Sequence, residues 1–154
     1  TNTAAFTGCA NLAREILTQS PAIPTHLAVA CGTGGTATGL LRGLAGASTL
    51  LGVSVLKGNF MQNTIQSLLT ELSPSPTPWE VHENYHHGGY ARRSTVLDEF
   101  IQSFYQEHEI LLEPIYTGKL FFALYDLLEQ DYFPKGSKVV AIHTGGLQAY
   151  ASSL

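Results

Sequence analysis

The feature that most limits the fold is a regular alternation of short apolar runs with segments of helical spacing. The apolar runs HLAVA, TLLGVSV, WEVH and KVVAIH are each short enough for a strand, and a segment with apolar residues every three or four positions lies between them. We expect strands at 26–30, 49–55, 79–82 and 138–143, and helices at 9–19, 35–44, 59–72, 96–104 and 118–128. Strands that alternate with helices in this way predict an α/β domain with an open, mostly parallel sheet and helices on both faces.

The composition indicates apolar surface that another part covers. The chain has 154 residues, of which 44% are hydrophobic and only 13% are charged, a low charged share for a free-standing soluble domain. One explanation is that parallel strands, buried on both faces, need little charge. The other is that a further domain or subunit covers part of the surface, and we favour this second explanation.

Charge and hydropathy exclude two classes of partner. The net charge is −4, and the pair Arg92-Arg93 is too small to form a nucleic-acid surface. No apolar run approaches the roughly 18 residues that span a bilayer, and residues 1–17 lack the basic and apolar segments of a secretory signal. We therefore expect neither a nucleic-acid nor a membrane partner. Cys9 and Cys31 form no CxxC pair, and two such thiols suggest a reducing cytoplasm.

A glycine-rich segment between a predicted strand and a predicted helix carries the clearest chemical signal. Its residues are Cys31, Gly32, Thr33, Gly34, Gly35 and Thr36. The glycines allow the backbone to approach a ligand closely, and the amides at a helix start attract an anion. The threonine hydroxyls add two donors, so the segment predicts a phosphate site.

Two other interpretations of this segment remain open. It could be a tight strand-to-helix turn with small residues for packing. It could also be a dinucleotide site, although the following strand (LLGVSV) ends without the acidic residue that holds a ribose hydroxyl. A Walker loop is excluded, because no Gly-Lys-Thr/Ser ending is present.

Two further motifs follow predicted strands or apolar runs. Pro114–Lys119 (PIYTGK) places Tyr116 at a helix start, where it could donate or accept a proton. His143–Leu147 (HTGGL) is a Gly-Gly turn after the last strand. Each is weak alone, but ligands of parallel sheets bind outside the carboxyl ends of the strands, so we expect the three motifs to meet there.

Taken together, CGTGGT, PIYTGK and FPKGSKVVAIHTGG resemble the 1-aminocyclopropane-1-carboxylate (ACC) deaminase and D-cysteine desulfhydrase family. That family belongs to the fold type II pyridoxal-phosphate enzymes, the tryptophan synthase β-like group. The resemblance runs from about Gly8 to the end, and Gly89-Tyr90-Ala91 matches the family's segment before a long helix. It implies that this chain is the C-terminal part of the large cofactor-binding domain.

The resemblance also implies a role for each site residue. The cofactor is pyridoxal 5'-phosphate, and Cys31 and Gly32–Thr36 would bind its phosphate. Tyr90 would lie near the ring and substrate, and Tyr116 would be the second active-site tyrosine, placed for proton transfer. Thr117 would face the pyridine nitrogen.

The identity of residue 117 favours one reaction within this family. ACC deaminases resemble one another in having Glu at this position, whereas D-cysteine desulfhydrases have Thr, as here. A carboxylate favours protonation of the ring nitrogen, which helps to open a cyclopropane, whereas loss of a thiolate needs less help. We therefore expect α,β-elimination from a small amino-acid substrate, D-cysteine or a β-substituted D-alanine, with pyruvate and ammonia as products.

The family's catalytic lysine has no counterpart in this chain. The lysines are Lys57, Lys119, Lys135 and Lys138, and none matches the Schiff-base position. We expect an absent N-terminal half to supply that lysine and the small domain, and the chain alone to be inactive. The resemblance suggests a homodimer for the complete enzyme.

Other functional interpretations carry less weight. His82, His86 and His87 cluster in sequence, but no carboxylate or cysteine completes a ligand set, so we expect no metal site. Cys31 has no basic partner nearby in sequence, so packing or phosphate-loop duty is favoured over a nucleophile. A non-catalytic module that binds a phosphate ligand or a partner protein remains a second hypothesis because the lysine is absent. A Rossmann-like nucleotide domain is a third.

Overall fold

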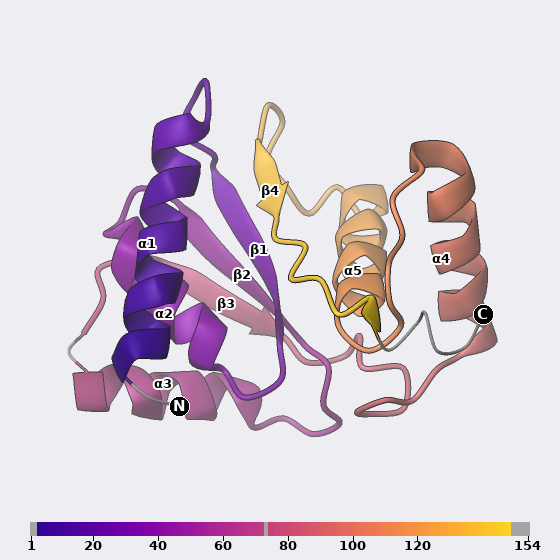
Figure 1. The fold of residues 1–154 in the computed structure, drawn as a ribbon, viewed down its shortest axis with the longest axis horizontal. Coiled ribbons are helices and arrows are strands. Elements are labelled where there is room, and N and C mark those ends of the chain that lie inside the picture. Colours follow the sequence, from indigo (N-terminus) through magenta and orange to yellow (C-terminus); the bar gives the residue numbers. More distant parts are fainter. Residues whose placement is uncertain (1–2, 73, 149–154) are drawn as a thin grey trace.

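The computed structural model describes residues 3–72 and 74–148, which form one sheet flanked by helices (Figure 1). The strands are β1 His26–Cys31, β2 Thr49–Ser54, β3 Trp79–His82 and β4 Val139–Ala141. The helices are α1 Thr3–Gln19, α2 Gly35–Leu44, α3 Met61–Leu72, α4 Thr95–His108 and α5 Thr117–Glu129. Within this part of the chain, no helix is both long and apolar enough to cross a membrane.

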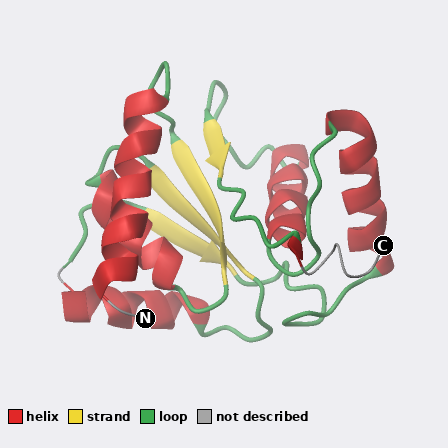
Figure 2. Ribbon diagram, in the orientation of Figure 1, coloured by secondary structure: helices red, strands yellow, loops and turns green. Residues whose placement is uncertain are grey.

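The sheet is parallel throughout its described strands. The strand order is β3-β2-β1-β4, and β1 lies between β2 and β4 with His26 opposite both Thr49 and Val139. Figure 2 shows the four strands between one group of helices beside α1 and a second group formed by α4 and α5. The predicted α/β class, with a parallel sheet and helices on both faces, is confirmed.

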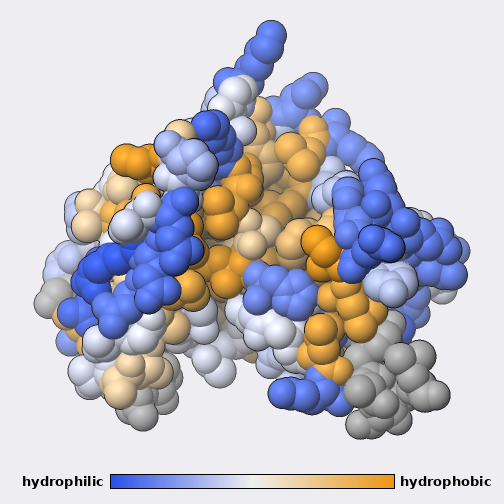
Figure 3. All heavy atoms as spheres, turned by 45° about the horizontal axis from the view of Figure 1, so that its top comes forward, coloured by the Kyte–Doolittle hydropathy of each residue, from blue (hydrophilic) through white to orange (hydrophobic). Residues whose placement is uncertain are grey.

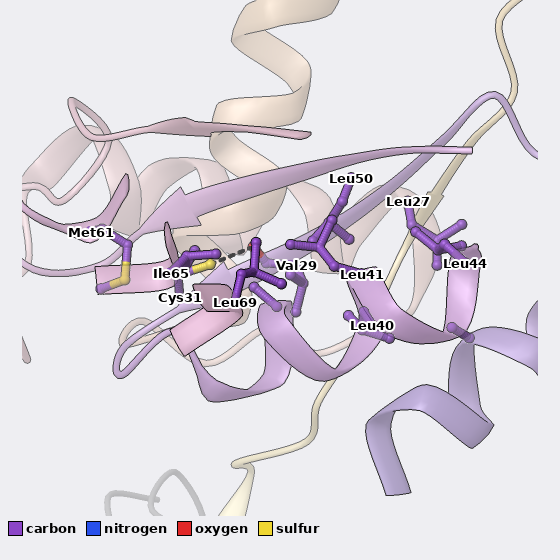
Figure 4. Packing of buried hydrophobic residues seen from close by; sticks show 12 residues of the cluster. Leu27, Val29, Cys31, Leu40, Leu41, Leu44, Leu50, Met61, Ile65 and Leu69 are labelled. Atoms are coloured by element: carbon purple, nitrogen blue, oxygen red, sulfur yellow. Dashed lines mark hydrogen bonds between the residues drawn. The ribbon is translucent and has the colours of Figure 1, made fainter. Parts of the chain in front are cut away.

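The two faces of the sheet follow the two-residue period of the strands. Leu27, Val29 and Cys31 of β1 pack with α1, α2 and α3 in one core, which Figure 4 shows from close by. Ala28 of β1 points the other way and joins α5 in a second core. Helix α4 packs outside α5 through a third cluster of Leu97, Ile101, Phe104 and Leu112.

Several element bounds differ from the prediction, and for α1 and β4 the physical reason is clear. Helix α1 begins at Thr3 rather than near residue 9, because Phe6 is buried and extends the packed face towards the N-terminus. The strand expected at 138–143 covers only Val139–Ala141. As an edge strand it pairs with β1 alone among the described strands, and after Ala141 the chain turns so that His143 Nε2 bonds the carbonyl of Leu111 at 2.9 Å.

Helices α1 and α2 pack so closely that α2 needs glycine at its contact face. A Cβ on Gly39 would lie 2.9 Å from the carbonyl oxygen of Phe6. A Cβ on Gly43 would collide with the carbonyl oxygen of Ala10 and lie 2.7 Å from the Cβ of Ala13. Backbone atoms cannot yield as a flexible side chain can, so this contact fixes α2 against α1.

We predict opposite effects of alanine at two helical glycines. Gly43→Ala should destabilise the chain by about 1–3 kcal/mol, because overpacking outweighs the better helix propensity of alanine. Gly8→Ala in α1, where a Cβ would meet nothing within 4 Å, should stabilise it by about 0.5–1 kcal/mol. Denaturant unfolding followed by circular dichroism measures both. A Gly43→Ala chain as stable as Gly8→Ala would contradict the close packing of α1 on α2.

Candidate functional site

A pocket of about 320 Å³ lies beyond the carboxyl end of β1. Three segments that are distant in sequence form its wall: the loop between β1 and α2, the start of α5, and the turn after β4. The residues that line it are Ala30, Cys31, Gly32, Thr33, Gly34, Gly35, Thr36, Ala37, Tyr116, Thr144, Gly145 and Gly146. The structure thus brings the three sequence motifs together at one edge of the sheet.

The glycine-rich loop leaves its hydrogen-bond donors unpaired. Gly34 is the N-cap of α2 with a φ of 76°, a left-handed conformation that a glycine adopts without strain, and no side chain caps this helix. Among the described residues, no N–H group of residues 32–37 and neither hydroxyl of Thr33 and Thr36 makes a hydrogen bond. Unpaired donors at a helix N-terminus attract an anion, so this wall of the pocket is suited to a phosphate.

Cys31 contributes to the pocket wall while its thiol points into the core. The side chain is 2% exposed, the Sγ atom lies 3.7 Å from the carbonyl oxygen of Val29, and a Cβ on Gly52 would be 3.0 Å from it. Burial raises the pKa of the Cys31 thiol to about 12. The thiol is therefore protonated at neutral pH, which disfavours a nucleophilic role.

The two predicted tyrosines come together at the pocket. Tyr116 faces the glycine loop, since a Cβ on Gly32 would lie 3.2 Å from its Cε1 atom. Its hydroxyl donates to the hydroxyl of Tyr90 at 3.4 Å, and the rings meet edge to face with centroids 6.1 Å apart. The hydrogen bond to Tyr90, burial and the charge of Glu113 raise the pKa of Tyr116 to about 12. Tyr116 therefore directs its proton to Tyr90, which is 54% exposed, and its part in proton transfer stays a prediction.

Thr117 lies behind the pocket wall and bonds within its own turn. It is fully buried, and its Oγ1 atom accepts from the N–H of Glu113 at 3.0 Å. The same hydroxyl lies 3.2 Å from Glu113 Oε1, to which it donates. Thr117 is not among the residues that line the pocket of this chain, so its contact with a ring nitrogen stays a prediction.

Glu113 is a site residue that the sequence analysis missed. It is 3% exposed, and its carboxylate accepts from the N–H groups of Ile115, Tyr116 and Thr117 at 2.7, 2.7 and 2.6 Å. It thereby fixes the turn that presents Tyr116 to the pocket. A carboxylate in an apolar run four residues before a helix start was the available signal, because such a group can satisfy the unpaired N–H groups there.

In the described part of the chain, no lysine or histidine belongs to the lining of the pocket. In the described part of the chain, no three His, Cys, Asp or Glu side chains gather closely enough to hold a metal ion. His82 packs against Tyr132, whereas His87 packs against Phe122 and bonds Ser94 Oγ at 2.8 Å.

Comparison with known proteins decides the family. The family described as "Pyridoxal-phosphate dependent enzyme" matches residues 1–145. The chain belongs to this pyridoxal-phosphate enzyme family. It is 31% identical over 155 residues to the bifunctional D-cysteine desulfhydrase/ACC deaminase of Arabidopsis thaliana. That alignment covers 91% of this chain and 38% of the Arabidopsis protein. The chain is 30% identical over 138 residues to an ACC deaminase of Bradyrhizobium diazoefficiens, which covers 80% of this chain and 40% of the other.

Two solved structures share the fold. The crystal structure of an ACC deaminase homologue superposes with a TM-score of 0.81 at 28% identity, covering 96% of this chain and 48% of that one. The processed form of threonine deaminase isoform 2 from Solanum lycopersicum, at 16% identity and a TM-score of 0.57, shares the fold alone. The chain therefore spans less than half the length of these relatives.

We predict that Tyr90→Phe lowers the pKa of Tyr116 from about 12 towards the ordinary tyrosine value of 10. The hydrogen bond to Tyr90 stabilises the protonated form of Tyr116, so its loss favours the tyrosinate. Tyrosine Cζ resonances followed by NMR against pH measure the change, with Tyr105→Phe on exposed α4 as the matched control. An unaltered Tyr116 titration in Tyr90→Phe would contradict the contact between the two hydroxyls.

Proposed function

We propose that this chain is the phosphate-binding part of a pyridoxal-phosphate enzyme that eliminates a β-substituent from a small amino acid, as a D-cysteine desulfhydrase does. The observation that carries the proposal is the set of unpaired donors in residues 32–37, which line a pocket at the uncapped start of α2. A phosphoryl group fits such a site because it offers several acceptor oxygens and negative charge. When bound, pyridoxal phosphate supplies the electron sink for the bond cleavage.

The residues of this chain would bind, orient and move a proton. The glycine loop and the hydroxyls of Thr33 and Thr36 would hold the phosphate. Tyr116, whose hydroxyl is protonated at neutral pH, would donate a proton across the pocket. Tyr90, whose hydroxyl accepts the hydrogen bond from Tyr116, would keep that proton directed and contact the substrate side.

The neutral side chain of Thr117 supports elimination over ring opening. Its hydroxyl donates to the carboxylate of Glu113, so it brings no charge of its own to the cofactor ring. The alternative within the family is ACC deamination. The Bradyrhizobium protein is named for this activity, and the Arabidopsis protein is named for both this activity and D-cysteine desulfhydration. Opening of a cyclopropane needs a cofactor that is a stronger electron sink. The neutral Thr117 does not favour protonation of the ring nitrogen as a carboxylate would, so the elimination is proposed first.

The partner proposed for this chain is the remaining part of the same enzyme. An apolar groove of about 170 Å³ lies between α5 and β4, and Tyr125 and Leu128 at its rim are 37% and 54% exposed. The groove is lined by Phe121, Leu124, Tyr125, Leu128, Phe133, Val139 and Ala141. Figure 3 shows apolar side chains gathered across the middle of the molecule between its more hydrophilic margins. That remaining part would cover this face and add its own strands beside β4, which is an edge strand of the described sheet.

A second candidate function is a non-catalytic module that binds a phosphate ligand. It is favoured by the absence of any lysine from the pocket lining of this chain. The complete enzyme would be a homodimer in the cytoplasm, a proposal that rests on the family resemblance and on the free thiols of Cys9 and Cys31.

The phosphate site is tested by a charge change at Gly34. Asp and Asn have nearly the same shape and both tolerate a left-handed backbone, so Gly34→Asp and Gly34→Asn differ mainly in charge. We expect Gly34→Asp to bind pyridoxal phosphate at least about tenfold (~1.4 kcal/mol) more weakly than Gly34→Asn, because the carboxylate repels the phosphate. Titration calorimetry measures both, and pyridoxal without its phosphate should bind the two variants equally. Equal affinities of the two variants for pyridoxal phosphate would reject the loop as its site.

The division of labour between the two halves is tested by borohydride reduction. The chain alone should bind pyridoxal phosphate without forming an adduct that borohydride fixes, since no lysine lines the pocket. Co-expression with the complementary part of the Arabidopsis relative should give a reducible adduct, and mass spectrometry should place it on that part. If borohydride fixed pyridoxal phosphate to Lys57, Lys119, Lys135 or Lys138 of the chain alone, the proposal that the other part of the enzyme supplies the Schiff-base lysine would be wrong.

A further inference from the structure

The loop that carries Tyr90 has an unusual backbone. His87, Gly88, Gly89 and Ala91 all have positive φ angles, of 50°, 100°, 124° and 53°. Positive φ is unfavourable for His87 and Ala91, which carry a Cβ. Contacts from outside the loop must therefore hold this conformation.

Lys119 contacts this loop from outside it. It is fully buried in the first turn of α5, and its Nζ atom donates to the carbonyl oxygen of Gly89 at 2.8 Å. A buried ammonium group is costly, and the positive end of a helix disfavours a cation there. Burial lowers the pKa of Lys119, and the charge of Glu113 opposes that shift. A lysine at this position needs a compensating contact, and the Gly89 carbonyl supplies it.

The start of α5 holds both tyrosines of the site. Glu113 binds the N–H group of Tyr116 at 2.7 Å and so fixes one partner. Lys119 binds Gly89, the residue directly before Tyr90, and so fixes the other. The same Gly89 carbonyl accepts the N–H group of Arg92 at 3.0 Å, which closes the turn around Tyr90.

We propose that Lys119 is a positioning residue that holds the Tyr90 loop through the Gly89 carbonyl and thereby keeps the Tyr90 hydroxyl against that of Tyr116. Lys119 does not line the pocket and its Nζ atom is directed to the loop, so it acts through Tyr90 and not on the cofactor. The consequence for catalysis rests on the proposed function, whereas the contact between loop and helix does not.

The variant Lys119→Met tests the proposal because its two effects on Tyr116 have opposite signs. Methionine keeps the apolar stem and removes the donor, so the loop loosens and the pKa of Tyr116 should fall from about 12 towards 10. Loss of a positive charge alone would raise a tyrosine pKa. NMR titration of the tyrosine Cζ resonances distinguishes the two directions, and a pKa of Tyr116 that stays or rises in the folded variant overturns the proposal.

Two further variants serve as controls for this measurement. Lys57→Met is the matched control, because Lys57 is an exposed lysine beside the same loop. A Cβ on Gly89 would lie 3.4 Å from the Lys57 Cβ. This variant should leave the Tyr116 titration unchanged. In a Tyr90→Phe background, Lys119→Met should lower the pKa of Tyr116 no further. A further fall of the same size in that background would show that Lys119 acts by another route, and would overturn the proposal.

Should Lys119→Met fail to fold, the unchanged chain decides the question. The Nζ hydrogens of Lys119 should exchange with water far more slowly than those of Lys57, and the Tyr90 and Tyr116 rings should show a nuclear Overhauser contact. Rapid exchange at Lys119, or rings without that contact, overturns the proposal. These measurements use no pyridoxal phosphate, so their failure is distinct from a failure of the phosphate site.

Discussion

The start of α2 is the constraint on which the site depends. A helix that begins directly after a buried parallel strand presents its first N–H groups at the edge of the sheet, where the dipole attracts an anion. In this chain Gly34 takes the left-handed conformation that begins α2, and no side chain satisfies the donors that follow. The close packing of α1 on Gly39 and Gly43 fixes the direction of α2 and hence of those donors.

A second helix start completes the site from the opposite side. The turn before α5 is held by Glu113, whose carboxylate accepts from the N–H groups of Ile115, Tyr116 and Thr117. The corresponding N–H groups at the start of α2 have no such acceptor. One helix start is therefore neutralised from within and the other is left for a ligand. This difference explains why Tyr116 is held by Glu113 at the start of α5 while the donors of the glycine loop remain available to a phosphate.

The sequence predicted the sheet and the meeting of the three motifs well, because buried parallel strands and glycine-rich turns leave strong local signals. It overestimated β4, since the run KVVAIH does not reveal that Val139–Ala141 has one neighbouring strand in the described sheet. The orientation of the Cys31 thiol could have been predicted, because it shares the face of Leu27 and Val29 in a two-residue period. The contacts of Glu113 could also have been predicted, because a carboxylate shortly before a helix start can accept from the N–H groups there. The contact of Lys119 could not, since it reaches a carbonyl thirty residues away in sequence.

The central claim is that the backbone of residues 32–37 binds a phosphoryl group. The most direct measurement is a titration of the ¹⁵N-labelled chain with pyridoxal phosphate, followed through the amide resonances. The account predicts that the largest shifts, moving to lower field as the amides acquire a charged acceptor, fall on residues 32–37 and are absent with pyridoxal. Shifts centred on the surface lysines, with the amides of 32–37 unmoved, would contradict it.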